Sequence, residues 1–195
     1  MNELTKRIGG FFLDIIQTIV LALSLFVVCY LFLFQVHVVK GSSMFPNFHD
    51  GDLILTDKIS YRFNLPQRFD VVVLKAPSSE PCSEQNCEYI KRIIGLPNDR
   101  IRLLNNQIFV DESIIAEPFL SSDIVTMGSS ALHEGETKTL ESEEYLVMGD
   151  NRTYSRDGRE FGPIKRNAII GKAWWRVWPV SDFGLVKHYS LQTAL

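Results

Sequence analysis

The chain of 195 residues has only three cysteines and no block of positive charge. Its 20 Lys and Arg are outnumbered by 23 Asp and Glu, so the composition does not indicate a nucleic-acid partner. The G-x-S-x-G motif of the α/β-hydrolases is absent, and no C-x-x-C pair offers the spacing of a zinc site. We therefore expect no nucleic acid, no metal and no cofactor.

The three cysteines fall in two places. Cys29 lies in a long apolar run, whereas Cys82 and Cys87 flank SEQN in the loop-like stretch PSSEPCSEQNC. If that loop lies outside the cytoplasm, a disulfide between Cys82 and Cys87 is one reading, and two free thiols are the other. A disulfide there closes a short loop and stabilises little beyond it.

The apolar run Ile15–Phe34 contains no charged residue. At about 1.5 Å per residue it spans roughly 30 Å, the thickness of the hydrocarbon layer. A buried core helix is the alternative, but Gln17, Thr18 and Ser24 form no continuous polar stripe. A cleaved signal peptide fits less well, since the run is long and no A-x-A site follows it. The run therefore predicts a transmembrane helix.

Charges beside the run predict its orientation. Lys6 and Arg7 precede it, which favours a cytoplasmic N-terminus, and Lys40 on the far side opposes this weakly. We expect a single-pass protein of the plasma (inner) membrane with everything after about Val38 outside the cytoplasm.

The remainder indicates a mainly β fold. Seven short segments are rich in β-branched or aromatic residues and bounded by turn formers, and no helical pattern alternates with them. Asn105 and Asn106 look like a two-residue hairpin turn. Residues 112–143 are more polar and predict a small lobe or long loop. The expected strands are 52–56, 70–74, 88–95, 100–104, 107–111, 144–150 and 168–180.

A nucleophile is expected in GSSMFP, just after the apolar run, where Ser42 and Ser43 are the candidates. A serine needs a group that takes its proton. No acid or glycine pattern marks any histidine, so a Ser-His-Asp site stays open but is not indicated. The four histidines are His37, His49, His133 and His188.

Lys91 in YIKRIIG interrupts an apolar run. Strand alternation places Tyr89, Lys91 and Ile93 on one face and Arg92 on the other. If the first face is buried, desolvation lowers the lysine pKa, and the neutral amine can act as a general base. A solvated surface lysine is the alternative.

Three segments occur in order: GSSMFP, YIKRIIGLPNDRI and MGDNRTYSRDGREFG. Together they resemble the motifs of the type I signal peptidases, membrane-bound serine endopeptidases that remove signal peptides. The resemblance implies that Ser43 is the nucleophile, that Lys91 is the general base and that Ser155 orients the lysine. It also implies that charged residues of the third segment support the structure of the site. Asp150 is expected to pair with Arg92, the outward neighbour of the lysine. A solvated turn that Asn151 begins is the alternative for the four charged residues that match charged positions of the family, which are Asp150, Arg152, Asp157 and Arg159.

Gly41 stands where some family members carry a serine that helps to stabilise the oxyanion. The oxyanion hole is then expected to use backbone N–H groups, including that of Ser43. Ser42 is a poor substitute, because adjacent residues of a strand point oppositely. Met44 and Phe45 are expected to line small pockets or to touch lipid.

The resemblance implies a signal-peptidase-like β-barrel or sandwich that cleaves preproteins after Ala-x-Ala sites. The substrate is expected to bind as an added strand. The expected surroundings of the enzyme are membrane lipid and the export translocon. A membrane-facing surface and a buried core are equally good places for the three tryptophans, Trp174, Trp175 and Trp178.

Two alternatives to a general signal peptidase stay open: a processing peptidase of the same family with narrower specificity, and a non-catalytic β domain tethered to the membrane. The expected parts are a short N-terminus 1–14, a transmembrane helix 15–34, a catalytic domain 35–99 and 144–185, an inserted lobe 100–143 and a tail 186–195.

Overall fold

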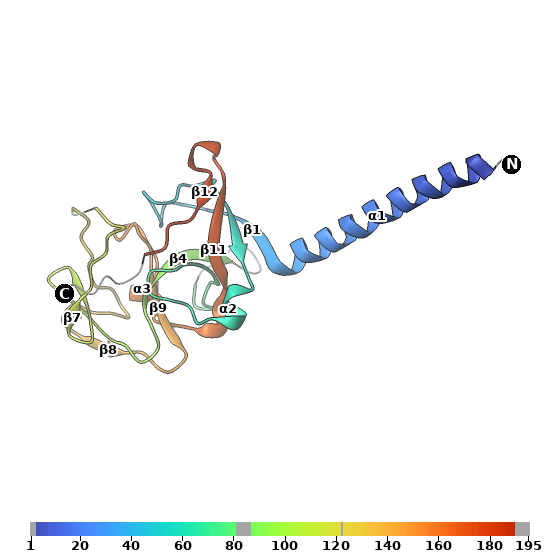
Figure 1. Ribbon diagram of the computed structural model, residues 1–195. Helices are drawn as coiled ribbons and strands as arrows, with labels where there is room; N and C mark the ends of the chain where they lie inside the picture. Colours follow the sequence, from blue (N-terminus) through green and yellow to red (C-terminus); the bar gives the residue numbers. More distant parts are fainter. Residues whose placement is uncertain (1–2, 81–86, 122, 190–195) are drawn as a thin grey trace.

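The structure is a computed structural model that describes residues 3–80, 87–121 and 123–189. Helix α1 (Glu3–Leu33) projects away from a β-rich body (Figure 1). Its stretch Gly9–Val28 is long and apolar enough to cross a membrane, and none of it is buried against the body. Exposed apolar side chains suit lipid rather than water. The helix is thus consistent with a membrane anchor, and it ends one residue before the predicted limit.

The larger sheet of the described residues has eight antiparallel strands in the order β1-β2-β11-β3-β4-β9-β10, with β12 paired to β11. The sheet curls into a half-barrel, so the edge strand β1 comes to face β4, although three strands separate them in this order. The strands are β1 (Phe34–Val38), β2 (Leu53–Asp57), β3 (Val71–Lys75), β4 (Glu88–Gly95), β9 (Glu144–Met148), β10 (Ile164–Lys165), β11 (Ile169–Trp178) and β12 (Gly184–Leu185).

A second sheet of the described chain has the order β7-β6-β5-β8, made of β5 (Arg100–Leu104), β6 (Gln107–Val110), β7 (Ser113–Ile114) and β8 (Thr137–Thr139). Short helical elements connect the strands of the larger sheet. They are α2 (Ser60–Phe63), α3 (Gly158–Phe161) and the 3₁₀ turns η1 (Arg166–Ala168) and η2 (Val180–Asp182).

Strand β4 is buried on both faces from Lys91 onward, and an apolar cluster covers each face there. Ile94 packs with Leu103 and other residues of the second sheet, whereas Ile93 packs with Val72 on the opposite side. Both isoleucines are fully buried. The side chains of Lys91 and Arg92, which precede these isoleucines on the two faces of β4, are therefore removed from water as well.

Every segment predicted as a strand coincides with a strand of the structure to within about two residues. The Asn105-Asn106 turn is also confirmed, since β5 and β6 pair with Leu104 opposite Gln107 and both asparagines have positive φ, 51° and 63°. Strand β1 was not predicted, because its first residue was counted with the apolar run. The choice between a Cys82–Cys87 disulfide and two free thiols involves Cys82, which lies outside the described residues.

The hairpin turn generates a stability prediction. At Asn106, φ is 63°, a region that a β-branched residue enters at a cost of about 1–2 kcal/mol. Asn106→Val should therefore lower the free energy of unfolding by about that amount, measured by denaturant titration in detergent. Asn106→Gly is the matched control and should change it by only a few tenths of a kcal/mol. Equal losses in both variants would contradict the assignment of this turn.

Candidate active site

Strand β4 carries Lys91 into the interior, opposite Val72 of β3. Lys91 is 3% exposed, and its Nζ lies 5.3 Å from the centre of the Tyr89 ring. Because burial disfavours a charged amine, the pKa of Lys91 is lowered to about 8. The sequence prediction of a desolvated lysine thus agrees with the geometry, and a fraction of this amine is neutral near neutral pH.

Ser43 lies in a run of turns between β1 and β2. Lys91 Nζ donates a hydrogen bond of 2.6 Å to Ser43 Oγ, although the two residues are 48 positions apart in the chain. Once the amine is neutral, its lone pair lies within reach of the hydroxyl proton. This is the geometry that a lysine needs to activate a serine, and no histidine is required for it.

Residues of the third motif, MGDNRTYSRDGREFG, hold the turn that contains Ser43 through hydrogen bonds to its backbone. The Asn151 N–H donates to Ser43 O at 3.0 Å, and Asn151 Nδ2 donates to Ser42 O at 3.0 Å. Gly149 lies so close that an added Cβ would overlap both Ser43 O and Ser155 Oγ. Sequence reasoning gave no role to Gly149 or Asn151, because their contacts join segments that are about 100 residues apart.

Ser155 lies beside this contact, with its Oγ buried and without a hydrogen-bond partner in the described part of the chain. The Gly149 backbone packs directly against it. The structure therefore brings Ser155 to the site, but no hydrogen bond joins it to Lys91 in the described residues.

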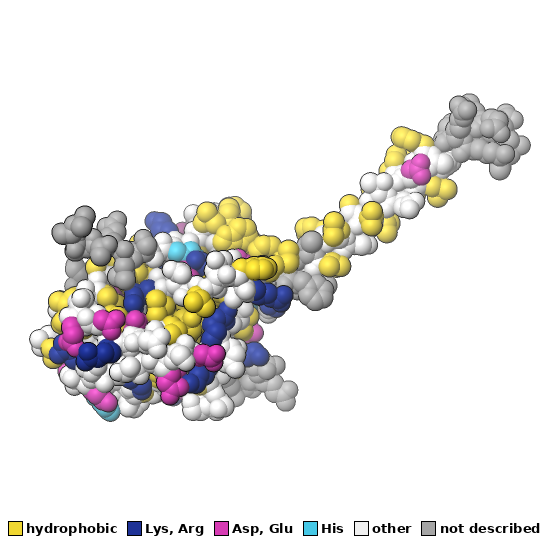
Figure 2. All heavy atoms as spheres, turned by 60° about the horizontal axis from the view of Figure 1, so that its bottom comes forward, with side chains coloured by type: hydrophobic (Ala, Val, Ile, Leu, Met, Phe, Trp, Pro, Cys, Tyr) yellow, Lys and Arg dark blue, Asp and Glu magenta, His cyan; other side chains and the backbone are white. Residues whose placement is uncertain are grey.

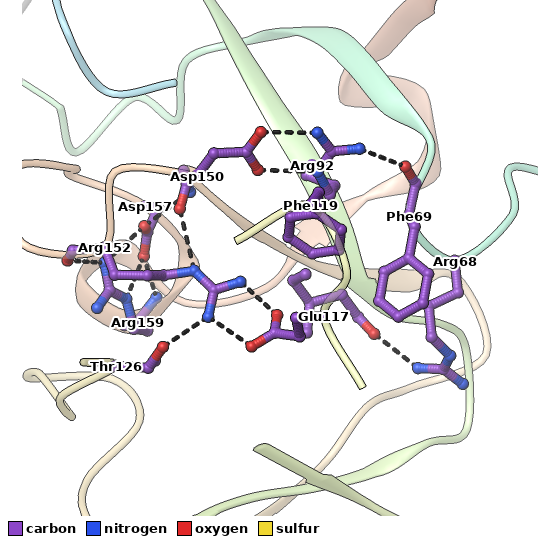
Figure 3. Close-up of polar contacts among 12 residues, drawn as sticks. Arg68, Phe69, Arg92, Glu117, Phe119, Thr126, Asp150, Arg152, Asp157 and Arg159 are labelled. Carbon is purple, nitrogen blue, oxygen red and sulfur yellow. Dashed lines mark hydrogen bonds and ion pairs between the residues drawn. The ribbon is translucent and has the colours of Figure 1, made fainter. Parts of the chain in front are cut away.

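Arg92 follows Lys91 on β4 and is only 2% exposed. Its Nε and Nη2 donate to the two carboxylate oxygens of Asp150 at 2.8 and 2.6 Å, as Figure 3 shows. Asn47 Nδ2 donates to the same carboxylate at 2.9 Å, and the Phe119 ring lies 4.1 Å from the guanidinium carbon. The Arg92–Asp150 pair was predicted, but Arg92 points into the core that the second sheet closes, not outward.

The three other charged residues to which the resemblance gives a structural role, Arg152, Asp157 and Arg159, are buried rather than solvated. Asp157 accepts from Gly149 N at 2.9 Å and from Arg159 Nε at 2.9 Å, and Arg159 Nη2 donates to Arg152 O at 2.7 Å. Arg152 forms an ion pair with Glu117. Figure 3 shows these residues as one network, so the alternative of a solvated turn is wrong.

The remaining predicted residues lie in the Ser43 turn. Gly41 has φ +83°, and its N–H donates to Asp50 Oδ1 at 2.6 Å. Met44 is fully buried in a core cluster with Phe48, whereas Phe45 is 49% exposed. Met44 therefore anchors the turn to the core and does not reach lipid.

A groove of about 410 Å³ opens between β1 and the first half of β4. Ser43 and Lys91 lie in its wall, and apolar side chains, among them Val39, Ile54 and Ile90, line it beside them. The Ser43 hydroxyl is thus presented to a cleft that can receive an extended peptide.

The sequence is similar to those of known proteins. The family described as signal peptidase, peptidase S26, matches residues 12–178. Signal peptidase I of Bacillus caldolyticus is 38% identical over 160 residues, which are 78% of this chain and 84% of that protein. Signal peptidase I V of Bacillus subtilis is also 38% identical, over 68% of this chain and 79% of its own length. A crystal structure of a signal peptidase I from Enterococcus faecalis aligns with a TM-score of 0.44 and 23% identity, covering 56% of this chain and 97% of that one.

The chain belongs to the signal peptidases of peptidase family S26. Its activity is that of signal peptidase I, a serine endopeptidase, and the family implies preproteins with signal peptides as substrates.

The close approach of Gly149 generates a prediction about activity. Gly149→Ala should push the Ser43 turn away from Lys91, and a misplacement of about 1 Å can cost roughly 100-fold in rate. Preprotein cleavage in detergent would measure the loss. Gly10→Ala is the matched control, since nothing lies within 4 Å of a Cβ there. Full activity of Gly149→Ala would mean that the close approach is dispensable.

The buried ion pair generates a prediction about stability. Asp150→Asn leaves Arg92 buried without its charge partner, which should cost about 3–5 kcal/mol of unfolding free energy. Glu112→Gln, in an exposed ion pair with Arg100 and Arg102, should cost less than about 1 kcal/mol. Denaturant titration of both variants tests this, and similar costs would contradict a structural role for the Arg92–Asp150 pair.

Proposed function

We propose that Ser43 is the nucleophile and Lys91 the general base of this signal peptidase. The 2.6 Å contact and the lowered lysine pKa support both roles. Ser43 Oγ attacks the scissile carbonyl carbon while its proton passes to the neutral Lys91 amine. The ammonium so formed then protonates the leaving nitrogen, and the C–N bond breaks. In the second half of the reaction, the amine takes a proton from the water that hydrolyses the acyl-enzyme.

The oxyanion of the tetrahedral intermediate is stabilised by backbone N–H groups of the 41–44 turn, including that of Ser43. Gly41 has no hydroxyl to offer, and Ser42 is held through its carbonyl by Asn151. Backbone donors fixed by such contacts require little reorganisation as negative charge develops. In this proposal Ser155 is a positioning residue, whose buried and unpartnered Oγ can accept from the Lys91 ammonium after a small shift.

The substrate binds as an extended strand in the groove between β1 and β4. Strand β9 pairs with β4 only from Arg92 onward, so Glu88, Tyr89 and Ile90 face the groove without a strand partner on that side. Backbone hydrogen bonds to such open edges align a peptide, and its alternate side chains enter the groove. The apolar wall beside Ser43 suits the small residues of an Ala-x-Ala site.

The N-terminus is cytoplasmic and the β-rich body lies on the outer side, with aromatic residues of β11 at the membrane interface. Trp174 stacks on Phe34, the first residue after α1, at 5.3 Å between ring centroids. Trp178 and Phe183 are 54% and 58% exposed. Figure 2 shows apolar side chains gathered on the body where the helix leaves it. Such rings are favoured at the level of the headgroups, and the export translocon supplies the substrates there.

The dyad generates a prediction about pH. Because the acting form of Lys91 is neutral, kcat/KM should rise about tenfold per pH unit below about pH 8 and level off above it. Ser43→Ala and Lys91→Ala should each abolish cleavage of a preprotein with an Ala-x-Ala site while the protein still unfolds cooperatively. Lys187→Ala, at an exposed lysine, should keep the wild-type profile. A flat profile, or an active Lys91→Ala protein, would refute these roles.

A further inference from the structure

A buried carboxylate near the amine of Lys91 belongs to a segment that none of the three motifs contains. Glu80 follows β3, and its N–H donates to Pro77 O at 3.0 Å, which holds it in a turn. Its side chain is only 3% exposed. A carboxylate in such a place is costly unless donors or a cation satisfy it. The partners of Glu80 therefore decide whether its charge is compatible with a neutral amine nearby.

Glu80 contacts the surroundings of Lys91 on one side. Tyr89 Oη donates to Glu80 Oε2 at 3.3 Å, and the centre of the Tyr89 ring lies 5.3 Å from Lys91 Nζ. Burial and the Glu80 carboxylate raise the pKa of Tyr89, so the phenol keeps its proton and remains a donor. Strand alternation places Tyr89 and Lys91 on the same face of β4. Glu80 thus fixes the aromatic ring that lies against the amine.

On its other side Glu80 contacts an arginine at the surface. Arg156 Nη2 donates to Glu80 Oε1 at 3.3 Å, and Arg156 Nε lies 3.3 Å from Oε2. Arg156 directly follows Ser155 in the third motif, and its side chain is 52% exposed. It also forms an ion pair with Glu160 at 3.0 Å. Glu80, Tyr89 and Arg156 therefore join the connection after β3, strand β4 and the third motif beside the amine.

The charge of Glu80 acts against the desolvation of Lys91. Burial lowers the pKa of Lys91, whereas Glu80 and two carboxylates of the third motif favour the ammonium. Those two carboxylates are bonded to buried arginines, as Asp150 with Arg92 and Asp157 with Arg159. The charge of the half-exposed Arg156 is partly screened by water, so it offsets that of Glu80 only in part. The other titratable groups that line the groove beside Lys91 are His37, Lys40 and Glu88.

We propose that Glu80 and Arg156 are positioning residues for the proposed general base. Glu80 holds the Tyr89 ring against the Lys91 amine, and Arg156 limits the negative charge that this hold brings to the amine. A carboxylate accepts a stronger hydrogen bond than a neutral group, but its charge favours the ammonium unless a cation offsets it. The two residues therefore act as a pair. The proposal rests on the proposed role of Lys91 as the base.

The test of the charge compares pH profiles of kcat/KM for the full chain in detergent, with a peptide that carries one Ala-x-Ala site. Glu80→Gln keeps the size of the side chain and an acceptor for Tyr89. Its rising limb should move by about 0.5–1 pH unit to lower pH. Arg156→Gln leaves the carboxylate without its cation, so its limb should move to higher pH by a smaller amount. On that limb kcat/KM should fall roughly two- to threefold, with little loss on the plateau.

The test of the hold is a double-mutant cycle on the plateau above the limb. Tyr89→Phe keeps the ring and removes the hydrogen bond, and Glu80→Ala removes its acceptor. Each variant should lower the plateau of kcat/KM, and the double variant should lower it no further than the worse single variant. Additive losses would show that Glu80 does not act through Tyr89 and would overturn this part of the proposal.

Matched controls are Glu112→Gln and Arg100→Gln, which belong to an exposed ion pair of the second sheet and should keep the wild-type limb. Limbs that stay in place in both Glu80→Gln and Arg156→Gln would overturn the proposal. Limbs that move in the same direction would do so too, because a merely loosened fold does not depend on the sign of the charge removed. A flat wild-type profile would instead refute the proposed role of Lys91. The position of a limb does not depend on the folded fraction, so it can be read even in a less stable variant.

Discussion

The site depends on the removal of one amine from water. Lys91 owes its lowered pKa first to desolvation, and the nearby carboxylates of Asp157 and Asp150 act in the opposite direction. Each of these carboxylates is bonded to an arginine, which offsets much of its negative field. If either arginine were absent, the uncompensated carboxylate would favour the ammonium. The buried ion pairs therefore favour the neutral form of Lys91, the proposed base, in addition to stabilising the fold.

Two adjacent residues of β4 have buried basic side chains that are stabilised in different ways. Lys91 and Arg92 are both nearly inaccessible, on opposite faces of the strand. Arg92 cannot lose its proton, so it is matched by a bidentate carboxylate and an aromatic ring. Within the part of the chain that the structure describes, Lys91 Nζ has only the Ser43 hydroxyl as a hydrogen-bond partner, and the pKa of Lys91 falls instead. The exchange of these two side chains would leave a permanent charge at the serine.

The sequence alone predicted seven of the strands and the lysine–serine pair, because strand periodicity is local and the three motifs are specific. For the third motif the resemblance implied a structural role, whereas the residues by themselves left a solvated turn open. Arg152, Asp157 and Arg159 are buried. Tyr154 and Arg156 of the same run are exposed, and no local pattern separates the two groups. The roles of Gly149 and Asn151 arise from backbone contacts with the Ser43 turn. Such contacts follow from the curl of the sheet, which no local pattern encodes.

The connection between anchor and site restricts where the enzyme can act. Strand β1 starts at Phe34 directly after Leu33, without a linker, and Ser43 follows ten residues after that helix end. Even a fully extended chain of that length reaches only about 35 Å, and the pairing of β1 with β2 holds its first half in place. The Ser43 hydroxyl, the proposed nucleophile, therefore stays within a fixed distance of the helix end. In the proposed arrangement, a peptide bond is accessible to it only when the substrate leaves the membrane within that distance, so the anchor would contribute to the choice of cleavage site together with the groove.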